Sequence, residues 1–320
     1  MRNERKLAIV GVGNVGATTA YALAQSRLFS EMVLIDIDRK RAQGEAEDLG
    51  HVIPFLAPME IYAGDYPDLA DAALIIITAG AAQKPGETRL DLIHQNLRIF
   101  RQIVADICRY NNEAILLVVT NPVDILTEVV RRLSGFPTHR VIGSGTVLDT
   151  ARLKFLLGRR LGVDMRQVHA LIIGEHGDSE LPVFSSANIS GLDLPHFSHG
   201  EKKPLDGADF TELFEKTRDA AYSIIAGKGA TYYGIAEATR RIVTAIWRDE
   251  AAILPVSAEP CGAYGLTGLS ISLPAIIGKE GVRQVLEIPL SDEELARLRQ
   301  SAAQIEEVLA AIHADMLCQI

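Results

Sequence analysis

One histidine stands where a side chain could transfer protons. His176 lies in the segment 174–179, Gly-Glu-His-Gly-Asp-Ser, directly after the apolar run 171–173. Glycines on either side leave an imidazole approachable, and an ordinary pKa of about 6.5 permits proton transfer in both directions near neutral pH. The chain has 8 His, so the type of residue alone does not distinguish a catalyst. His176 is a candidate general acid and base because of its position.

A carboxylate and a guanidinium stand three residues apart in a helix predicted over residues 147–161. Asp149 and Arg152 therefore share a face of that helix. The carboxylate could hold one imidazole nitrogen and stabilise an imidazolium, and the guanidinium could bind a substrate carboxylate through two parallel hydrogen bonds. The alternative is an ion pair between the two residues along the helix. Their local sequence by itself favours that ion pair.

Two further polar segments follow strands of the predicted sheet. Asn121 begins the run Asn-Pro-Val-Asp, and its amide could hydrogen-bond a substrate oxygen, although a simple Asn-Pro turn is equally compatible. The segment 78–89 contains Gly80 and a Pro-Gly pair and ends at Arg89. It predicts either a loop that closes over the site or a flexible surface connection.

A glycine motif near the start of the chain has the spacing of a dinucleotide-binding turn. Gly11, Gly13 and Gly16 follow an apolar run and precede an Ala-rich helical stretch. In that order they permit a tight turn, leave room for a pyrophosphate, and let helix and strand approach closely. Asp36, twenty residues beyond Gly16, could accept both ribose hydroxyls and would repel a 2′-phosphate. These features favour NAD over NADP. The alternative, in which Asp36 only caps a turn and the glycines only bend the chain, does not explain why the strand, the glycines, the helix and the acid occur together.

The elements that have to position these residues follow an α/β pattern in the first half of the chain. Short Val/Ile/Leu runs alternate with amphipathic segments, which is typical of parallel strands buried on both faces. We therefore predict a doubly wound parallel sheet of the Rossmann type, with strands at residues 7–12, 32–36, 59–62, 73–78, 115–119 and 141–144. Ligands bind at the carboxyl edge of such a sheet.

The pattern changes after residue 144 and predicts an α+β substrate domain. Helices are expected at 147–161, 211–226 and 231–248, with hairpin-like runs at 168–173 and 253–256 and a polar surface loop at 196–209. A last helix begins at Ser291, which forms a capping box with Glu294. The predicted division is a dinucleotide-binding domain at 1–143 and a substrate and catalytic domain at 144–320.

Composition narrows the class of protein. A chain of 320 residues with 48% hydrophobic side chains is long enough for two packed domains. Its formal net charge of -9 and its lack of a basic run with aromatics argue against nucleic acid as a partner. Three widely spaced cysteines, Cys108, Cys261 and Cys318, without a Cys-x-x-Cys pair, indicate a reducing compartment and no metal centre. No apolar run approaches the roughly 20 residues that cross a bilayer, so we expect a cytoplasmic protein.

Six motifs in this order resemble the lactate/malate dehydrogenase family over essentially the whole chain. They are Gly-x-Gly-x-x-Gly, Gln-Lys-Pro-Gly-Glu-Thr-Arg, Asn-Pro-Val-Asp, Leu-Asp-Thr-Ala-Arg, Gly-Glu-His-Gly-Asp-Ser and Lys-Gly-Ala-Thr. The resemblance implies an NAD-dependent 2-hydroxy acid dehydrogenase that assembles as a homotetramer. Hydride transfer to a carbonyl leaves an alkoxide, and proton donation and positive charge would act where that charge develops.

The resemblance also implies a role for each candidate residue. His176 exchanges the proton of the substrate oxygen, Asp149 orients it, and Arg89 polarises the carbonyl. Arg152 binds the substrate carboxylate, Asn121 bonds the reacting oxygen, and Thr231 lines the pocket. The residues implied for the cofactor are Gly11, Gly13, Asn14, Val15, Gly16, Asp36, Thr78, Ala79, Gly80, Asn121 and Ile235.

Gln83 bears on the choice of substrate. In the malate members of the family an arginine stands at the matching loop position and pairs with a second carboxylate. Gln83 is neutral, and burying an unpaired charge costs several kcal/mol. We therefore expect reversible hydride transfer between NADH and pyruvate, giving L-lactate and NAD. A 2-hydroxyisocaproate or other 2-hydroxy acid dehydrogenase and a catalytically silent NAD-binding regulator remain the alternatives, whereas an NAD-dependent glycosidase would need metal ligands that no cysteine near these motifs supplies.

One departure from the family pattern concerns regulation. In members activated by fructose 1,6-bisphosphate, an arginine and a histidine bind the sugar phosphates between subunits. The matching positions here are Lys154 and His169. Lysine lacks the planar fork that grips a phosphate through two bonds, so we expect modest or absent activation. The alternative is that both are ordinary interface residues without a ligand.

Overall fold

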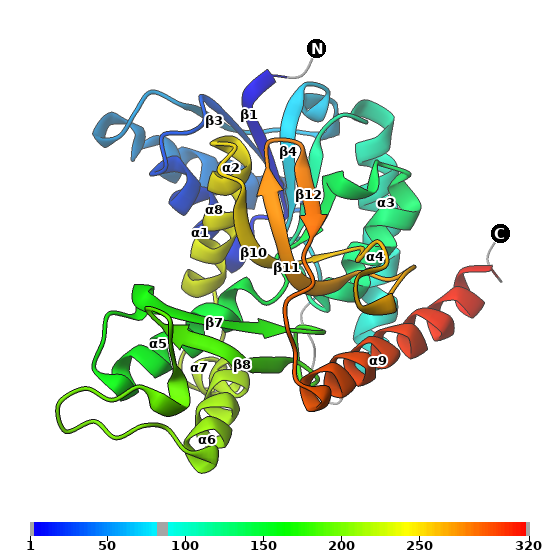
Figure 1. Cartoon of the computed structure of the whole chain (residues 1–320). Helices are drawn as coiled ribbons and strands as arrows, with labels where there is room; N and C mark the ends of the chain where they lie inside the picture. Colours follow the sequence, from blue (N-terminus) through cyan, green and yellow to red (C-terminus); the bar gives the residue numbers. More distant parts are fainter. Residues whose placement is uncertain (1–2, 82–88, 318–320) are drawn as a thin grey trace.

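The structure is a computed structural model that describes residues 3–81 and 89–317 (Figure 1). Strands and helices alternate along the first half. The strands described there are β1 (Asn3–Val10), β2 (Glu31–Ile35), β3 (Glu60–Ala63), β4 (Ala72–Ile77), β5 (Ile115–Val118) and β6 (Val141–Gly143). The helices between them are α1 (Asn14–Ala24), α2 (Arg39–Gly50), α3 (Arg89–Tyr110) and α4 (Val123–Ser134).

The second half mixes helices with antiparallel strands. The strands are β7 (Val168–Ile173), β8 (Leu181–Ile189), β9 (Leu192–Asp193), β10 (Ala252–Ala258), β11 (Ile271–Gly278) and β12 (Gly281–Val285). The helices are α5 (Val147–Leu161), α6 (Gly207–Arg218), α7 (Ala220–Lys228), α8 (Tyr233–Trp247) and α9 (Asp292–Leu317). The predicted doubly wound α/β fold with an α+β second half is confirmed.

All six predicted strands of the first half lie in one sheet and run parallel to one another within it. Its order is β12-β11-β10-β6-β5-β4-β1-β2-β3, and neighbours from β6 to β3 run parallel. The run 253–256, predicted as a hairpin of the second half, is β10. It pairs antiparallel with β6, where Ser257 faces Gly143, so that β10, β11 and β12 extend the first sheet. Pairing depends on backbone geometry that the apolar run does not encode.

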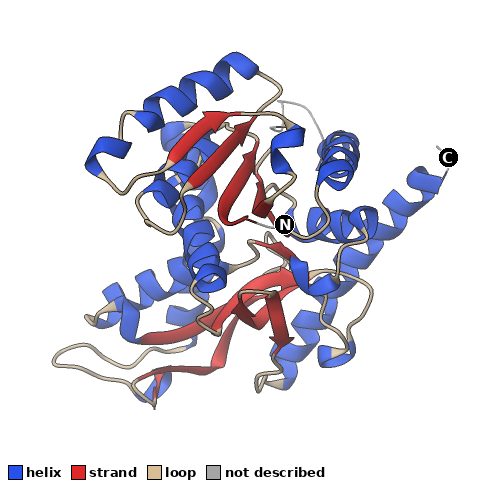
Figure 2. Ribbon diagram, turned by 90° about the horizontal axis from the view of Figure 1, so that it is seen from above, coloured by secondary structure: helices blue, strands red, loops and turns tan. Residues whose placement is uncertain are grey.

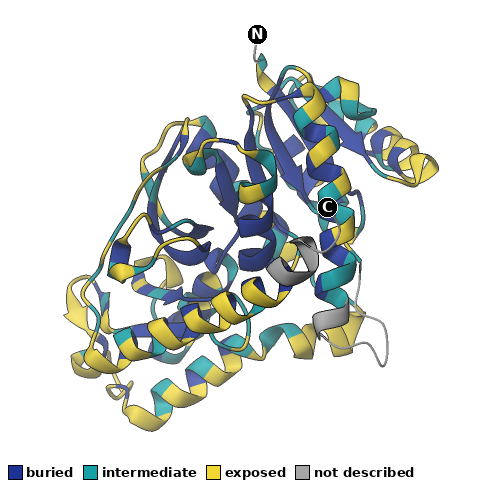
Figure 3. Ribbon diagram, turned by 90° about the vertical axis from the view of Figure 1, so that its right-hand side faces the viewer, coloured by how far each residue is buried: buried dark blue, intermediate teal, exposed yellow. Residues whose placement is uncertain are grey.

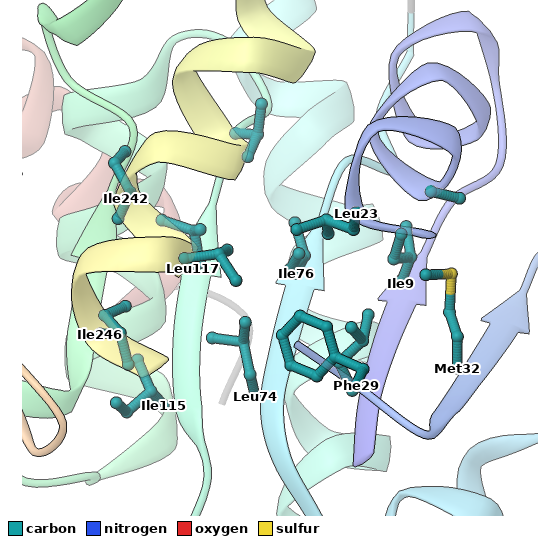
Figure 4. Close-up of a cluster of buried hydrophobic side chains, with 14 of the residues drawn as sticks. Ile9, Leu23, Phe29, Met32, Leu74, Ile76, Ile115, Leu117, Ile242 and Ile246 are labelled. Carbon is teal, nitrogen blue, oxygen red and sulfur yellow. The ribbon is translucent and has the colours of Figure 1, made fainter. Parts of the chain in front are cut away.

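Alternation along the buried strands supplies both faces of the sheet. In β1, Ile9 packs among side chains of α1 and α8, whereas Ala8 packs with α3 and α4 on the other face. Figure 4 shows the first of these clusters, with Ile9 and Leu23 on one side and Ile242 of α8 on the other. Seen from above, the strands lie between helices (Figure 2). Burial on both faces explains why these strands are continuously apolar.

A smaller unit lies below this sheet in Figure 1. The antiparallel sheet β7-β8-β9 packs against α5, and Leu153, Leu157 and Ile172 are fully buried between them. The long helix α9 turns an apolar stripe inward and exposes its outer face (Figure 3). Its predicted capping box is present, because Ser291 Oγ accepts from the Glu294 N–H and a Glu294 oxygen accepts from the Ser291 N–H.

The helix predicted over residues 211–226 is wrong in its extent. Two helices, α6 and α7, replace it, and the chain turns at Asp219 between them. Asp206 caps α6 by accepting the N–H groups of Ala208 and Asp209, which places the helix start before the predicted residue. Among the described helices, none has the length and apolarity needed to cross a membrane.

Candidate active site

Three elements from different parts of the chain meet at the end of β7. Gly174 follows β7 and pairs with Ser272 of β11, so the chain leaves the smaller sheet against the larger one. The first turns of α4 and α5 lie against the segment that follows, since residues of both helices hydrogen-bond to His176. The site is therefore built where the two units of the fold join.

His176, Asp149 and Arg152 form one connected group. Asp149 Oδ2 lies 2.6 Å from His176 Nδ1, and Asp149 Oδ1 accepts a hydrogen bond of 2.7 Å from Arg152 Nη1. The Asp149 side chain is 2% exposed, and that of His176 is 23% exposed. The contact of Asp149 with the imidazole and the ion pair along the helix, which the sequence offered as alternatives, are therefore present together.

The electrostatics of the group favour a charged imidazole. Burial by itself lowers the pKa of His176, but the charge and hydrogen bond of Asp149, helped by Glu180 and Asp124, raise it to about 9. Burial likewise raises the pKa of Asp149, but its contacts with His176 and Arg152 outweigh burial and lower that pKa. Asp149 therefore stays ionised, and His176 carries a proton that it can donate at neutral pH.

Two carboxyl groups of this site were not among the candidates. Asp124, buried at the start of α4, accepts the backbone N–H of His176 at 2.7 Å and the hydroxyl of Ser272 at 2.9 Å. Glu180, buried just before β8, has Oε2 3.9 Å from His176 Nδ1. Asp124 belongs to the Asn-Pro-Val-Asp run, and Glu180 stands four residues beyond His176. Those positions were visible in the sequence, but their burial beside the imidazole was not.

The same side chains offer atoms that could hold a metal ion. One ligand atom each from Asp149, His176 and Glu180 lies within 4.8 Å of the others. Both Asp149 oxygens are already engaged, one by the imidazole and one by the Arg152 guanidinium. A divalent cation would have to compete with the Arg152 guanidinium for the same carboxylate, and the two positive charges would repel each other. This disfavours metal binding here.

The glycine turn has the shape that a dinucleotide requires. Gly11 has a φ of +95°, and a Cβ there would lie 2.4 Å from the backbone of Ala79. A Cβ on Gly16 would lie 2.0 Å from the Gly11 carbonyl oxygen. Gly13 instead faces open space, and α1 begins after it without a side-chain cap. The turn is therefore closed on the protein side and open at the helix N-terminus, where a pyrophosphate would fit.

Thr78 and Ala79, which follow β4, complete this turn. The Thr78 hydroxyl donates to the Gly11 carbonyl at 2.5 Å, and the Ala79 N–H donates to the Val10 carbonyl at 2.9 Å. Gly80 comes next, and a Cβ there would lie 2.4 Å from the methyl group of Thr120. The strand ends of β1, β4 and β5 are thereby held at one edge of the sheet.

Asp36 follows β2 beside the glycine turn. Its carboxylate accepts the N–H groups of Val12 at 2.7 Å and Asp38 at 2.9 Å. The capping role considered as an alternative is therefore present. It also fixes the carboxylate next to the glycine turn, where a ribose would lie when a pyrophosphate occupies the helix N-terminus.

The remaining described candidates lie on neighbouring elements. Asn121 is exposed after β5, and its backbone carbonyl accepts a hydrogen bond of 3.1 Å from the side-chain amide of Asn96. Thr231 precedes α8 and is half-buried, as is Ile235 in the first turns of that helix. Helix α8 packs against α1 and against α5, which connects the cofactor turn to the helix that carries Asp149.

Some candidates fall partly or wholly outside the described residues. Gln83 lies in the segment 82–88 and Cys318 in the segment 318–320, and neither segment is described. Arg89 is the first residue of α3 by its backbone, and the structure describes no side chain for it. Lys154 lies on α5, where burial lowers the pKa of its ammonium group, and His169 is exposed on the adjoining strand β7.

Family models match both halves of the chain. The lactate/malate dehydrogenase NAD binding domain matches residues 5–143, and the lactate/malate dehydrogenase alpha/beta C-terminal domain matches residues 146–315. A dinucleotide-binding sheet joined to a histidine and aspartate site defines an NAD-dependent dehydrogenase of 2-hydroxy acids. The chain belongs to the lactate/malate dehydrogenase family.

Individual relatives agree with this assignment. The chain is 51% identical over 304 residues to an L-lactate dehydrogenase of Thermoanaerobacter sp. (strain X514), covering 95% of this chain and 98% of the relative. It is 52% identical over 306 residues to an L-lactate dehydrogenase of Priestia megaterium, covering 95% of each. A solved structure of the minor L-lactate dehydrogenase from Enterococcus mundtii has a TM-score of 0.93 at 41% identity, covering 96% of this chain and 98% of that one.

Proposed function

We propose that this protein is an L-lactate dehydrogenase, which reversibly reduces pyruvate to L-lactate with NADH as the hydride source. The observation that carries the proposal is the connected group of His176, Asp149 and Arg152. It provides a protonated imidazole and a guanidinium, both joined to one buried carboxylate. Relatives named L-lactate dehydrogenase, which are 51% and 52% identical to this chain over nearly its full length, support the choice of substrate.

His176 acts as the proton donor in this proposal. Asp149 engages Nδ1, so the imidazolium presents its Nε2 proton to the substrate oxygen. When bound, NADH supplies the hydride that reaches the carbonyl carbon. The alkoxide that develops takes the proton of His176, and Asp149 keeps the imidazole oriented throughout. In the reverse direction neutral His176 removes the hydroxyl proton of lactate.

Arg152 anchors the substrate through its carboxylate. A guanidinium has five N–H donors, and the hydrogen bond to Asp149 uses one nitrogen, Nη1. The fork that remains matches the planar geometry of a 2-oxo acid carboxylate. Asn121 bonds the reacting oxygen, Arg89 polarises it, and Thr231 lines the pocket in the proposed arrangement.

The side chain of the 2-oxo acid depends on Gln83. A neutral amide leaves a second substrate carboxylate unpaired, so pyruvate is preferred over oxaloacetate. A 2-hydroxyisocaproate dehydrogenase is the second candidate, because Gln83 does not exclude an apolar side chain larger than methyl. Initial rates of NADH oxidation with pyruvate, oxaloacetate and 2-oxoisocaproate separate these functions. Absence of turnover with all three would refute the proposal and favour the silent NAD-binding regulator or a dehydrogenase of another 2-hydroxy acid.

Assembly and location belong to the same proposal. We propose a homotetramer in the cytoplasm. Each chain would contribute a dinucleotide-binding domain at 1–143 and a substrate domain at 144–320. Helix α7 has no buried residue, and it exposes Tyr222 by 61%, Ile224 by 39% and Ile225 by 47%. Apolar side chains gathered on one exposed helix are typical of a surface that a second copy covers. Sedimentation velocity of the purified chain tests the tetramer.

A further inference from the structure

Glu180 is a buried carboxyl group beside His176 that the proposed mechanism does not use. Its side chain is 2% exposed, and its Oε2 lies 3.9 Å from His176 Nδ1. That separation is too long for a hydrogen bond, and Asp149 already occupies Nδ1 at 2.6 Å. Opposite charges at this distance still interact strongly in a buried site. Glu180 therefore influences the imidazole through its charge.

The surroundings of Glu180 favour its neutral form. Among the described side chains and backbone, no group hydrogen-bonds its buried Oε1. Burial, and then the charge of Asp149, raise the pKa of Glu180 to about 8, although His176, Arg152 and the backbone of Gly177 act in the opposite direction. At neutral pH the carboxyl group is mostly protonated, and it gains its negative charge as the solution becomes alkaline.

We propose that Glu180 is a positioning residue that acts through His176, and that its ionisation makes His176 bind the proton that it donates more tightly. The inference rests on the proposed function, since it concerns the proton transferred in that reaction. Ionised Glu180 adds one negative charge beside the imidazolium and stabilises it. As the pH rises, His176 then stays protonated to a higher pH than Asp149 alone would permit.

The other charged groups around His176 do not change in the same range. Asp149 and Arg152 face it from α5. Burial raises the pKa of Asp149, but its contacts with His176 and then with Arg152 outweigh burial and lower that pKa, so Asp149 is ionised across this range. Asp124 faces the backbone of His176 from α4, and burial raises its pKa to about 6. Asp124 is therefore already charged where Glu180 titrates. Of these described groups, Glu180 is the one whose charge changes together with that of His176.

The test uses the effect of charge on both directions of the reaction. The variant Glu180→Gln keeps the shape of the side chain and removes its ionisation, while Glu180→Asp keeps the carboxyl group but withdraws it. Glu212→Gln is the matched control, because Glu212 is an exposed carboxylate of α6 paired with Lys216. For each protein, kcat/KM is measured from pH 5.5 to 9.5 for pyruvate with NADH and for lactate with NAD. NADH binding by fluorescence checks that each variant is folded.

The expected result has opposite signs in the two directions. In Glu180→Gln the pKa of His176 falls, so the alkaline limb of pyruvate reduction and the rising limb of lactate oxidation both move to lower pH by at least about 0.5 unit. At a fixed pH on these limbs, pyruvate reduction falls and lactate oxidation rises, each by roughly threefold. Glu180→Asp shifts both limbs by a smaller amount, and Glu212→Gln leaves them in place.

Several outcomes would overturn the inference. Limbs that stay within about 0.2 pH unit of the parent in Glu180→Gln, or activities that fall together in both directions, would mean that Glu180 has only a structural role. If Glu180→Gln does not fold, pH limbs that stay in place in Glu180→Asp would lead to the same conclusion. A parent chain that does not reduce pyruvate with NADH would instead refute the proposed function, so the two failures are distinguishable.

Discussion

The Asp149→Asn substitution tests the central contact of the site. Asp149 Oδ2 lies 2.6 Å from His176 Nδ1 in a buried environment, and this contact is the largest factor that raises the pKa of His176 to about 9. Asparagine has nearly the same shape but no charge. Without the carboxylate, burial lowers the pKa of His176 against weaker opposition from Glu180 and Asp124. We expect that pKa to fall to the ordinary value of 6.5 or below.

The size of the effect follows from the fraction of imidazolium. At pH 7.5 nearly every His176 with a pKa of about 9 is protonated, whereas a pKa of 6.5 leaves roughly one in ten protonated. The value of kcat/KM for pyruvate should therefore fall at least about tenfold at pH 7.5 from protonation alone. The loss should shrink as the pH approaches 5.5, because the imidazole of the variant regains its proton there.

The assay is pyruvate reduction with saturating NADH between pH 5.5 and 9.5. Asp193→Asn, which removes an exposed carboxylate near His196, is the matched control and should leave the profile unchanged. A loss of equal size at every pH, with the alkaline limb still near 9, would refute the reasoning. It would mean that Asp149 orients the imidazole by shape and contributes nothing through charge.

Four other expectations concern single features of the site. His176→Asn should lower turnover at least roughly a hundredfold while fluorescence shows NADH binding unchanged; retained turnover would remove His176 from the mechanism. Gln83→Arg should move the ratio of kcat/KM for pyruvate to that for oxaloacetate by about tenfold or more towards oxaloacetate, and a smaller change would exclude Gln83 as the discriminating residue. In Gly16→Ala the added Cβ would meet the Gly11 carbonyl at 2.0 Å, so NADH titration should give an affinity at least about tenfold weaker; an unchanged affinity would contradict the close packing. Pyruvate saturation curves with millimolar fructose 1,6-bisphosphate, at slightly acid and neutral pH, should change little, and a tenfold fall in half-saturation would show that Lys154 binds the effector well.

The sequence alone predicted the elements that local rules govern. Strands β4 and β5 are continuous apolar runs that are buried along their whole length, and their positions follow from that composition. The glycine turn was predictable because a positive φ at Gly11 and the close approach at Gly16 exclude other side chains. The capping box at Ser291 was visible for the same reason, since its hydrogen bonds join residues three apart.

Tertiary structure decided what depends on residues distant in the chain. The ion pair of Asp149 with Arg152 could be inferred from helical spacing, but the contact of Asp149 with His176 joins α5 to the segment after β7. Burial of Glu180 and Asp124 beside that imidazole likewise arises only when the two units pack together. The pKa of a side chain depends on desolvation and nearby charge, and both are properties of the packed site. Residue types and order thus determined which groups were available, whereas packing determined which of them hold the proton.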